Sequence, residues 1–507
     1  MNTKQARFDS VCEKARQAMK LQTAADTLEW DERTGMPSGG GDYRAEQVSM
    51  LRGMVHELRT DAQYGDDLCR LIDDVAGQDP HSDESATVRE LHRDWDRDRK
   101  LPTPLVRKTS EATVKGQQVW DAARKSNDFA KFRPSLENII SLKREAGERW
   151  SEGSDRTPYE ALLDEYEPDA SVEQLQKIFD DVRVPLVKLI AEIKDAPVQP
   201  NVSILEQDFC VDAQRKFSHR ISKLIGFDFD RGRLDETSHP FCTTLGPKDI
   251  RILTRFETNW VPSGIFGTLH ETGHGLYEQG MRYEWFGLPP GSYVSLGMHE
   301  SQSRLWENQV GRSRAFWSHL YEETQATFAP QLDNVTLDEF HFAVNTIRPS
   351  LIRVEADEAT YNLHIIIRFD LERQLIEGTL SVADLPAAWN SRYQSDLGIT
   401  PPSDADGVLQ DVHWSAGLIG YFPTYTLGNL ASAQLYDAAA VELGDLEAMF
   451  AQGNFKPLLE WLVEHVHRHG RCYSGSELIQ KATGKPLSAD ALVGYLQGKL
   501  RPLYGLS

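Results

Sequence analysis

The sequence has few cysteines and no long apolar run. Five cysteines occur without a C-x-x-C pair: Cys12, Cys69, Cys210, Cys242 and Cys472. An odd, scattered set excludes a disulfide framework and is typical of a reduced intracellular protein. No stretch approaches the roughly 18 apolar residues of a membrane span, and the N-terminus has no apolar signal-peptide core. We therefore expect a soluble, cytoplasmic protein.

Basic residues are also scarce. The chain has 55 Lys and Arg against 77 Asp and Glu, which gives a formal net charge of −22. Nucleic acids and anionic membranes are bound by clustered basic side chains that displace counterions. This composition therefore argues against both kinds of partner.

Most of the chain shows helical spacing of apolar residues, interrupted by short breaks at 35–41 and 101–104. The linker 195–200 (DAPVQP) is a plausible joint between two helical lobes. Only 231–261 is rich in β-branched and aromatic residues around a Gly-Pro turn, which indicates a small antiparallel ribbon. The sequence predicts a mainly α fold with one short sheet, and it contains no internal repeat.

The stretch GTLHETGHGLYEQG at 267–280 contains the pattern His270-Glu271-x-x-His274. Residues four apart lie on one face of a helix, so both imidazoles could bind one metal ion beside the Glu271 carboxylate. Zinc in such a site lowers the pKa of a bound water, and a neighbouring carboxylate can take its proton. The alternative is a pair of structural histidines whose hydrogen bonds are satisfied within the helix.

A third ligand is needed, and a third histidine downstream does not supply it. The metzincin pattern would require His at 280, where this chain has Gly280. Glu278 lies about 12 Å along the helix from His270, so it is better interpreted as an outer acid. Glu300 is favoured, on a predicted second helix near 297–308. Glu307 and His299 are rivals, and a solvated polar face without a ligand is the remaining alternative.

Two further segments carry candidate substrate-binding residues. In IRVEAD (352–357), Arg353 and Asp357 are four apart on an expected helix. One interpretation is an ordinary ion pair within the helix. The other is that Asp357 holds Arg353, which presents its guanidinium to a substrate carboxylate. The glycine- and aromatic-rich stretch 407–429 indicates close packing near a pocket, where a tyrosine hydroxyl could donate to an oxyanion. The alternative for this stretch is a tight turn between core helices. His465, His467 and His469 have no completing ligand and are interpreted as structural.

Taken together, these motifs resemble the carboxypeptidase Taq family of zinc metallocarboxypeptidases, and the likeness runs almost end to end. The segments that carry it are Trp30-Asp31, Thr34-x-Met36-Pro37, LLDEYEP at 162–168, His239-Pro240-Phe241, HETGH at 270–274, His299-Glu300-Ser301-Gln302, IRVEAD at 352–357 and GVLQDVHW at 407–414.

The resemblance implies a single metallocarboxypeptidase domain over 1–507, mainly helical, with a deep substrate groove and a small sheet near the zinc site. It implies peptide substrates and a homodimer. One zinc ion per chain is expected on His270, His274 and Glu300, with cobalt as a possible substitute. Glu271 is the expected general base and acid, aided at the oxyanion by Tyr425, Tyr421 or His239. The expected substrate-binding residues at the closed end of the groove are Arg353, Asp357, Gln410 and His413.

Two other functions are compatible with parts of the pattern. A helical zinc oligopeptidase that cuts internal bonds of short peptides would share H-E-x-x-H and a remote glutamate, but it would have no use for a cationic stop at Arg353. A non-catalytic scaffold with structural zinc would need four protein ligands and no open position for water.

Overall fold

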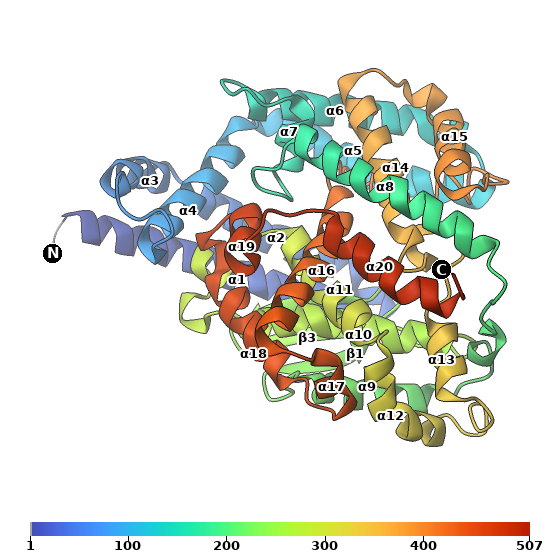
Figure 1. The fold of residues 1–507 in the computed structure, drawn as a ribbon. Coiled ribbons are helices and arrows are strands. Elements are labelled where there is room, and N and C mark those ends of the chain that lie inside the picture. Colours follow the sequence, from blue (N-terminus) through green and yellow to red (C-terminus); the bar gives the residue numbers. More distant parts are fainter. Residues whose placement is uncertain (1–2, 507) are drawn as a thin grey trace.

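The computed structural model describes residues 3–506, and helices dominate it (Figure 1). The expected mainly α fold is confirmed. The first part of the chain forms α1 (Thr3–Thr34), η1 (Ser38–Gly40), α2 (Gly41–Arg59), α3 (Ala62–Val75), α4 (Asp83–Lys100), α5 (Thr103–Ser126), α6 (Phe129–Ser151), α7 (Pro158–Leu163) and α8 (Val172–Lys194). The expected breaks at 35–41 and 101–104 separate α1 from α2 and α4 from α5. Within the described residues, no helix is long and apolar enough to cross a bilayer.

The middle of the chain carries the sheet and two helices that matter for the site. It forms η2 (Val202–Leu205), α9 (Val211–Ile225), β1 (Gly232–Glu236), β2 (Phe241–Gly246), β3 (Asp249–Thr254), α10 (Val261–Gly280), η3 (Tyr283–Trp285), η4 (Pro289–Gly291), α11 (Leu296–Arg304), a π-helical turn η5 (Leu305–Val310), α12 (Arg314–Thr327) and α13 (Leu337–Val344).

The last part begins with a short turn and returns to helices. It forms η6 (Arg353–Glu355), α14 (Thr360–Glu377), η7 (Val382–Asp384), α15 (Leu385–Leu397), α16 (Pro423–Leu443), α17 (Leu446–Ala451), α18 (Lys456–His465), η8 (His467–Cys472), α19 (Gly475–Thr483) and α20 (Asp490–Leu503).

The sheet has the strand order β1-β3-β2 and is mixed. Strands β2 and β3 form the expected antiparallel hairpin, but β1 pairs parallel to β3, so the wholly antiparallel ribbon is wrong in this detail. The segment 237–240 carries the chain from the end of β1 back across the sheet, which lets β3 run between the other two strands. A pattern of β-branched residues predicts strands but not their direction.

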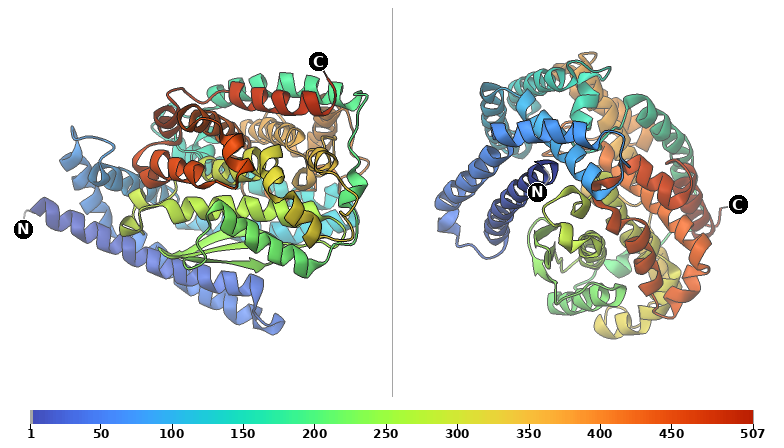
Figure 2. Two further views of the ribbon diagram at one scale, coloured as in Figure 1. Left: turned by 60° about the horizontal axis from the view of Figure 1, so that its bottom comes forward. Right: turned by 90° about the vertical axis from the view of Figure 1, so that its left-hand side faces the viewer.

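Helices cover both faces of this sheet (Figure 2). Ile250 and Ile252 of β3 are buried in the same core as the apolar residues of α10. Arg251 lies between them in sequence, and its guanidinium is 4.1 Å from the ring centre of Trp30 on α1. Because side chains alternate along a strand, α10 and α1 pack on opposite faces. Strand β3 is thereby fixed against the helix that carries the histidines.

Two large hydrophobic cores make up most of the interior. One contains residues of α5–α8, α14, α15 and α20, and the other contains residues of the sheet, α9–α13 and α17–α19. The segment 195–200 connects α8 of the first core to η2 of the second. Helix α16 serves both, because Leu430 packs in the first core and Leu435 in the second. The candidate site lies along this helix, where the two cores meet.

Candidate active site

Helix α10 carries His270 and His274 one turn apart, as their spacing predicts. Between them, Gly273 packs directly on the backbone of α11. A Cβ at this position would lie 2.5 Å from the carbonyl oxygen of Gln302, so any other residue would push the two helices apart. The glycine of HETGH thus allows α11 to approach the histidine face closely.

Glu300 of α11 completes a cluster with these histidines, and the ligand atoms of the three residues lie within 4.8 Å of one another. Glu300 Oε2 is 3.5 Å from His270 Nε2 and 3.5 Å from His274 Nε2. Ligands about 2.1 Å from a tetrahedral ion lie about 3.4 Å apart, so both distances from Glu300 to the imidazoles match those expected at a zinc site. The side chain of Glu300 is packed against Gly428 of α16, where a Cβ would lie 2.6 Å from Glu300 Cγ.

Glu307 and His299, the other candidates for the third ligand, instead accept hydrogen bonds from the two histidines. His270 Nδ1 donates to Glu307 Oε2 at 2.9 Å, and His274 Nδ1 donates to the carbonyl oxygen of His299 at 3.0 Å. Both bonds select the tautomer that leaves Nε2 free to bind a metal. Arg304 donates to Glu300 Oε1 at 2.7 Å and leaves Oε2 toward the histidines.

His299 also forms hydrogen bonds with residues outside the cluster. Its Nε2 contacts Glu278 Oε1 at 3.0 Å, and Thr244 of β2 donates to Glu278 Oε2 at 2.9 Å. Glu278 is therefore an outer acid, as its distance along α10 predicts. His467 is buried and contacts Gln302 at 2.9 Å, which agrees with its structural interpretation.

The electrostatics of the cluster suit a cation. Burial lowers the pKa of His274 to about 3, so its imidazole is neutral at ordinary pH. Burial alone would raise the pKa of Glu300, but Arg304 and His270 outweigh it and hold this pKa well below its usual range. A neutral imidazole and an ionised carboxylate are the forms that bind zinc.

Glu271 points into the same region and is 5% exposed. Its Oε2 has no hydrogen-bond partner among the described residues. Burial raises the pKa of Glu271 to about 7. A buried oxygen without a partner costs free energy unless a water or substrate group occupies the space beside it. This carboxylate is therefore suited to take a proton from a water at the cluster.

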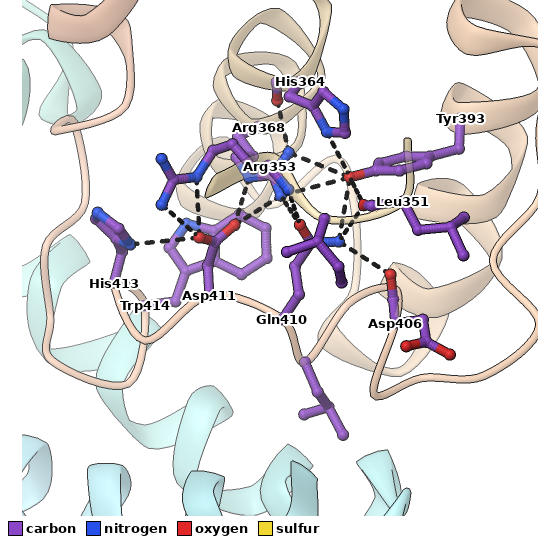
Figure 3. A network of polar contacts seen from close by, with 12 residues as sticks. Leu351, Arg353, His364, Arg368, Tyr393, Asp406, Gln410, Asp411, His413 and Trp414 are labelled. Atoms are coloured by element: carbon purple, nitrogen blue, oxygen red, sulfur yellow. Dashed lines mark hydrogen bonds and ion pairs between the residues drawn. The ribbon is translucent and has the colours of Figure 1, made fainter. Parts of the chain in front are cut away.

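Arg353 is 6% exposed and lies in the short turn η6 rather than on a helix (Figure 3). Its Nε and Nη2 donate to Asp411 Oδ1 at 2.9 and 2.8 Å. The expected pairing with Asp357 is wrong, because α14 begins only at Thr360. Asp357 instead accepts bonds from the backbone N–H groups of Arg348 and Ala359 and fixes the turn around η6.

Gln410 and Arg368 complete this network (Figure 3). Gln410 Oε1 accepts from the backbone N–H of Arg353 at 2.8 Å and from Arg368 Nη2 at 2.8 Å. Gln410 Nε2 donates to the carbonyl oxygens of Leu351 and Asp406 at 3.0 Å. The amide of Gln410 is thus engaged within the protein, where it holds Arg353.

Tyr361 connects the two halves of the site. Its hydroxyl accepts from Arg353 Nη1 at 3.1 Å, and the guanidinium of Arg304 lies 4.4 Å from its ring centre. Because Arg304 also holds Glu300, only two side chains separate the metal cluster from Arg353.

The remaining expected residues fall into two groups. His413 Nε2 is 3.3 Å from the Tyr425 hydroxyl, and the ring centres of Tyr421 and Tyr425 are 5.5 Å apart, so these three lie together. The guanidinium of Arg353 lies 5.3 Å from the Tyr425 ring centre. His239, in contrast, is exposed in the loop between β1 and β2, and none of the contacts between described residues joins it to the cluster.

Sequence reasoning assigned no role to four residues that organise the site: Arg304, Tyr361, Arg368 and Asp411. Arg304 lies four residues after Glu300 and three before Glu307, a spacing that by itself indicates ion pairs with both. Asp411 is 58 residues from Arg353, and no local spacing connects them.

Known proteins are similar to this chain over nearly its whole length. The family model described as carboxypeptidase Taq (M32) metallopeptidase matches residues 10–500. Thermostable carboxypeptidase 1 of Thermus thermophilus is 42% identical over 510 residues, 99% of this chain and 100% of its own. Carboxypeptidase 1 of Bacillus subtilis is 37% identical and covers 95% of each chain.

Solved structures show the same likeness. The crystal structure of an M32 carboxypeptidase from Deinococcus radiodurans has a TM-score of 0.95 at 41% identity and covers 99% of this chain and 100% of its own. Metallocarboxypeptidase 1 of Trypanosoma cruzi has a TM-score of 0.93 at 32% identity, covering 98% and 99%. The chain described here therefore belongs to the carboxypeptidase Taq (M32) family of metallopeptidases and is a peptide-hydrolysing enzyme of the carboxypeptidase class.

Proposed function

We propose that this enzyme is zinc-dependent and releases the last residue of peptides that have a free C-terminus. One zinc ion per chain is assigned to His270, His274 and Glu300, and cobalt is expected to substitute for it. The observation that carries the proposal is Tyr361, which contacts both Arg304 beside the metal ligand and the buried Arg353. A buried cation connected to the cluster through these contacts would bind the C-terminal carboxylate of a peptide and so favour cleavage of its last peptide bond.

Zinc held by His270, His274 and Glu300 would supply Lewis-acid polarisation of the carbonyl and would lower the pKa of a bound water. Glu271 takes the proton of the attacking water and delivers it to the leaving amine, so the carboxylate is regenerated in each turnover. Arg353 binds the substrate carboxylate through its guanidinium, whose orientation Asp411 fixes.

The developing oxyanion needs hydrogen-bond donors, and we assign this role to Tyr425 and Tyr421. Burial raises the pKa of Tyr421 to about 12 and that of Tyr425 well above its usual range, so both hydroxyl groups keep their protons at neutral pH. His413 orients Tyr425. A role for His239 would require the β1–β2 loop to bring it inward, and it is proposed as a further donor on that condition.

The test uses one N-acetylated peptide in two forms, with a free and with an amidated C-terminus. The protein is treated with a chelator and then supplied with zinc or cobalt, and products are identified by mass spectrometry. Release of single C-terminal residues from the free form alone, only after metal is restored, is expected. Internal cleavage of both forms would instead identify an oligopeptidase, and activity that survives complete metal removal would overturn the metal assignment.

For assembly and location, we propose a homodimer in the cytoplasm. The dimer rests on the family resemblance. All five cysteines are free, as expected in a reducing compartment. Analytical ultracentrifugation at micromolar concentration is expected to give twice the mass of one 57.3 kDa chain, and a monomer mass would contradict the dimer.

A further inference from the structure

The segment that follows α7 contacts the N-terminus of the helix that carries Glu300. The carbonyl oxygen of Tyr166 accepts from the backbone N–H of Leu296 at 3.2 Å. The next residue, Glu167, accepts from the backbone N–H of Gly297 through Oε1 and is also hydrogen-bonded to the Ser295 hydroxyl. Three consecutive residues at the start of α11 are thus held by two consecutive residues of a segment about 130 positions earlier.

The contact leaves no room for a side chain at position 297. A Cβ on Gly297 would lie 2.7 Å from Glu167 Oε1. Glu167 is 7% exposed, and none of the ion pairs between described residues includes it. Burial raises the pKa of this carboxyl to about 8. A buried carboxyl group without a cation is costly, and the hydrogen bonds from the Gly297 N–H and Ser295 reduce that cost only in part, since burial still raises the pKa.

The position of this contact on α11 decides what it controls. Glu300 follows Gly297 by three residues, which is about one helical turn or 4.5 Å along the axis. Its Oε2 must lie at the same distance from two Nε2 atoms of α10, so a small axial shift of α11 would break the geometry. Arg304 fixes the carboxylate from the other side, but it moves together with α11. Contacts from outside the helix must set its position: Gly273 and Gly428 allow α10 and α16 to approach it closely, and Glu167 holds its N-terminus.

The segment itself is anchored independently. Asp164 accepts from Arg93 of α4 at 2.6 Å and also from Arg156. On its other side, the Tyr166 ring packs edge-on against Tyr421 with ring centres 5.1 Å apart. The segment is therefore attached to a helix outside the cluster, and it contacts both the metal side and the substrate side of the site.

We propose that Glu167 is a positioning residue of the metal centre, which sets the place of α11 along α10 and thereby brings Glu300 Oε2 within reach of the ion. This inference rests on the proposed assignment of Glu300 as a metal ligand. It explains why a glutamate and a glycine face each other between the LLDEYEP segment and α11.

The experiment measures the zinc dissociation constant of folded protein by competition with a chromophoric chelator. It also records the visible absorption spectrum of the cobalt-loaded protein. Glu167→Ala is expected to weaken zinc binding about 10- to 100-fold, the usual cost of losing an outer partner, and to change the cobalt spectrum. Glu167→Gln is expected to bind zinc within about threefold of the wild type, because its amide oxygen can accept the same N–H bond.

The matched control is Asp370→Asn on α14. This carboxylate is 4% exposed and pairs with Arg183 and Arg392, so its loss destabilises the fold without touching α11. Unchanged zinc affinity in the control is expected. If Glu167→Ala does not fold, Gly297→Ala disturbs the same contact from the other side and should weaken zinc binding similarly.

Wild-type affinity in both Glu167→Ala and Gly297→Ala would overturn the inference, as would equal weakening in the Asp370→Asn control. Glu300→Ala distinguishes a failure of the metal assignment from a failure of the role of Glu167 alone. If this variant binds zinc as tightly as the wild type, the metal assignment itself fails, and the role of Glu167 fails with it.

Discussion

Arg353 is held by Asp411, which lies 58 residues later in the chain and bonds to the guanidinium through one oxygen, at 2.9 and 2.8 Å. The second oxygen of Asp411 binds Arg368 at 2.6 Å. One buried carboxylate thus neutralises only part of the combined positive charge of two buried guanidinium groups. Its pKa is held well below the usual range, because Arg353 and Arg368 outweigh the effect of burial. The positive charge left over is available to an anionic substrate group.

Asp411→Asn is expected to weaken the contact that holds the Arg353 guanidinium at the substrate end of the site. The variant leaves two buried guanidinium groups with less compensation, which should destabilise the fold by about 3–5 kcal/mol and raise the KM for free-carboxylate peptides. Thermal unfolding and steady-state kinetics measure the two effects. Asp357→Asn is the control, since Asp357 contacts the backbone near η6. A larger KM effect in the control would contradict the role of Asp411.

Arg353→Ala is expected to lower kcat/KM for free-carboxylate peptides about 100-fold, because two charge-assisted hydrogen bonds to the substrate are lost. Arg353→Lys should restore little, since a point charge cannot replace the planar fork. The measurement compares peptides that differ only in an amidated C-terminus. If the wild type and Arg353→Ala discriminate equally between them, Arg353 does not bind the carboxylate.

Glu271→Gln is expected to keep its zinc and to lose kcat by about 10³-fold, because an amide cannot accept the proton of the attacking water. Atomic absorption measures whether the variant keeps its zinc, and kcat at saturating peptide measures the loss of turnover. Glu278→Gln, two turns further along the same helix, should have a much smaller effect on kcat. Near-normal turnover in Glu271→Gln would exclude it as the general base.

Glu307→Ala is expected to weaken zinc binding about 10- to 100-fold, because His270 loses the acceptor that fixes its tautomer and ring orientation. The zinc dissociation constant is the readout. Glu323→Ala provides an exposed-carboxylate control, as this residue pairs with Arg220 at the surface. Unaltered affinity in Glu307→Ala would show that His270 needs no such partner.

Glu372 predicts a pH dependence of stability. It is fully buried, accepts from Tyr159 at 2.7 Å and from the backbone N–H of Gly420 at 3.1 Å, and burial raises its pKa from 4.5 to about 7. Between these values the folded protein holds a proton that the unfolded chain releases, so the contribution of Glu372 to stability is fully present below pH 4.5 and is lost as pH rises through 7. The contribution lost is about 3 kcal/mol.

Glu372→Gln removes this titration. The melting temperature of the wild type relative to the variant is therefore expected to decrease between pH 4.5 and pH 8, measured by differential scanning fluorimetry. A difference that stays constant with pH, or that increases, would contradict the assignment.

Local sequence patterns were sufficient for the parts of this protein that depend on neighbours in the chain. Helix periodicity predicts α10 and α11, the spacing of His270 and His274 places both imidazoles on one face, and the break at 35–41 ends α1 where glycines and a proline require it. The favoured third ligand, Glu300, follows from its polar face and the family resemblance, and the structure brings it to the two histidines.

Sequence patterns did not predict contacts between residues far apart in the chain, nor the direction in which two strands pair. The parallel pairing of β1 with β3 depends on how 237–240 crosses the sheet, and alternation along a strand carries no information about that. The assignment of Asp357 to Arg353 assumed that helix α14 begins earlier than it does, while the actual partner comes from a loop after α15. His239 was placed by its motif alone, and it lies exposed.

The sequence by itself thus determined the chemistry: two imidazoles and a base at helical spacing, because an α-helix repeats every 3.6 residues whatever surrounds it. Only the tertiary structure decided which group each of three buried carboxylates contacts. Asp411 binds Arg353, Glu307 binds His270 and Glu167 binds the backbone N–H of Gly297. The free energy of such a contact depends on distance and burial, which spacing in sequence does not encode.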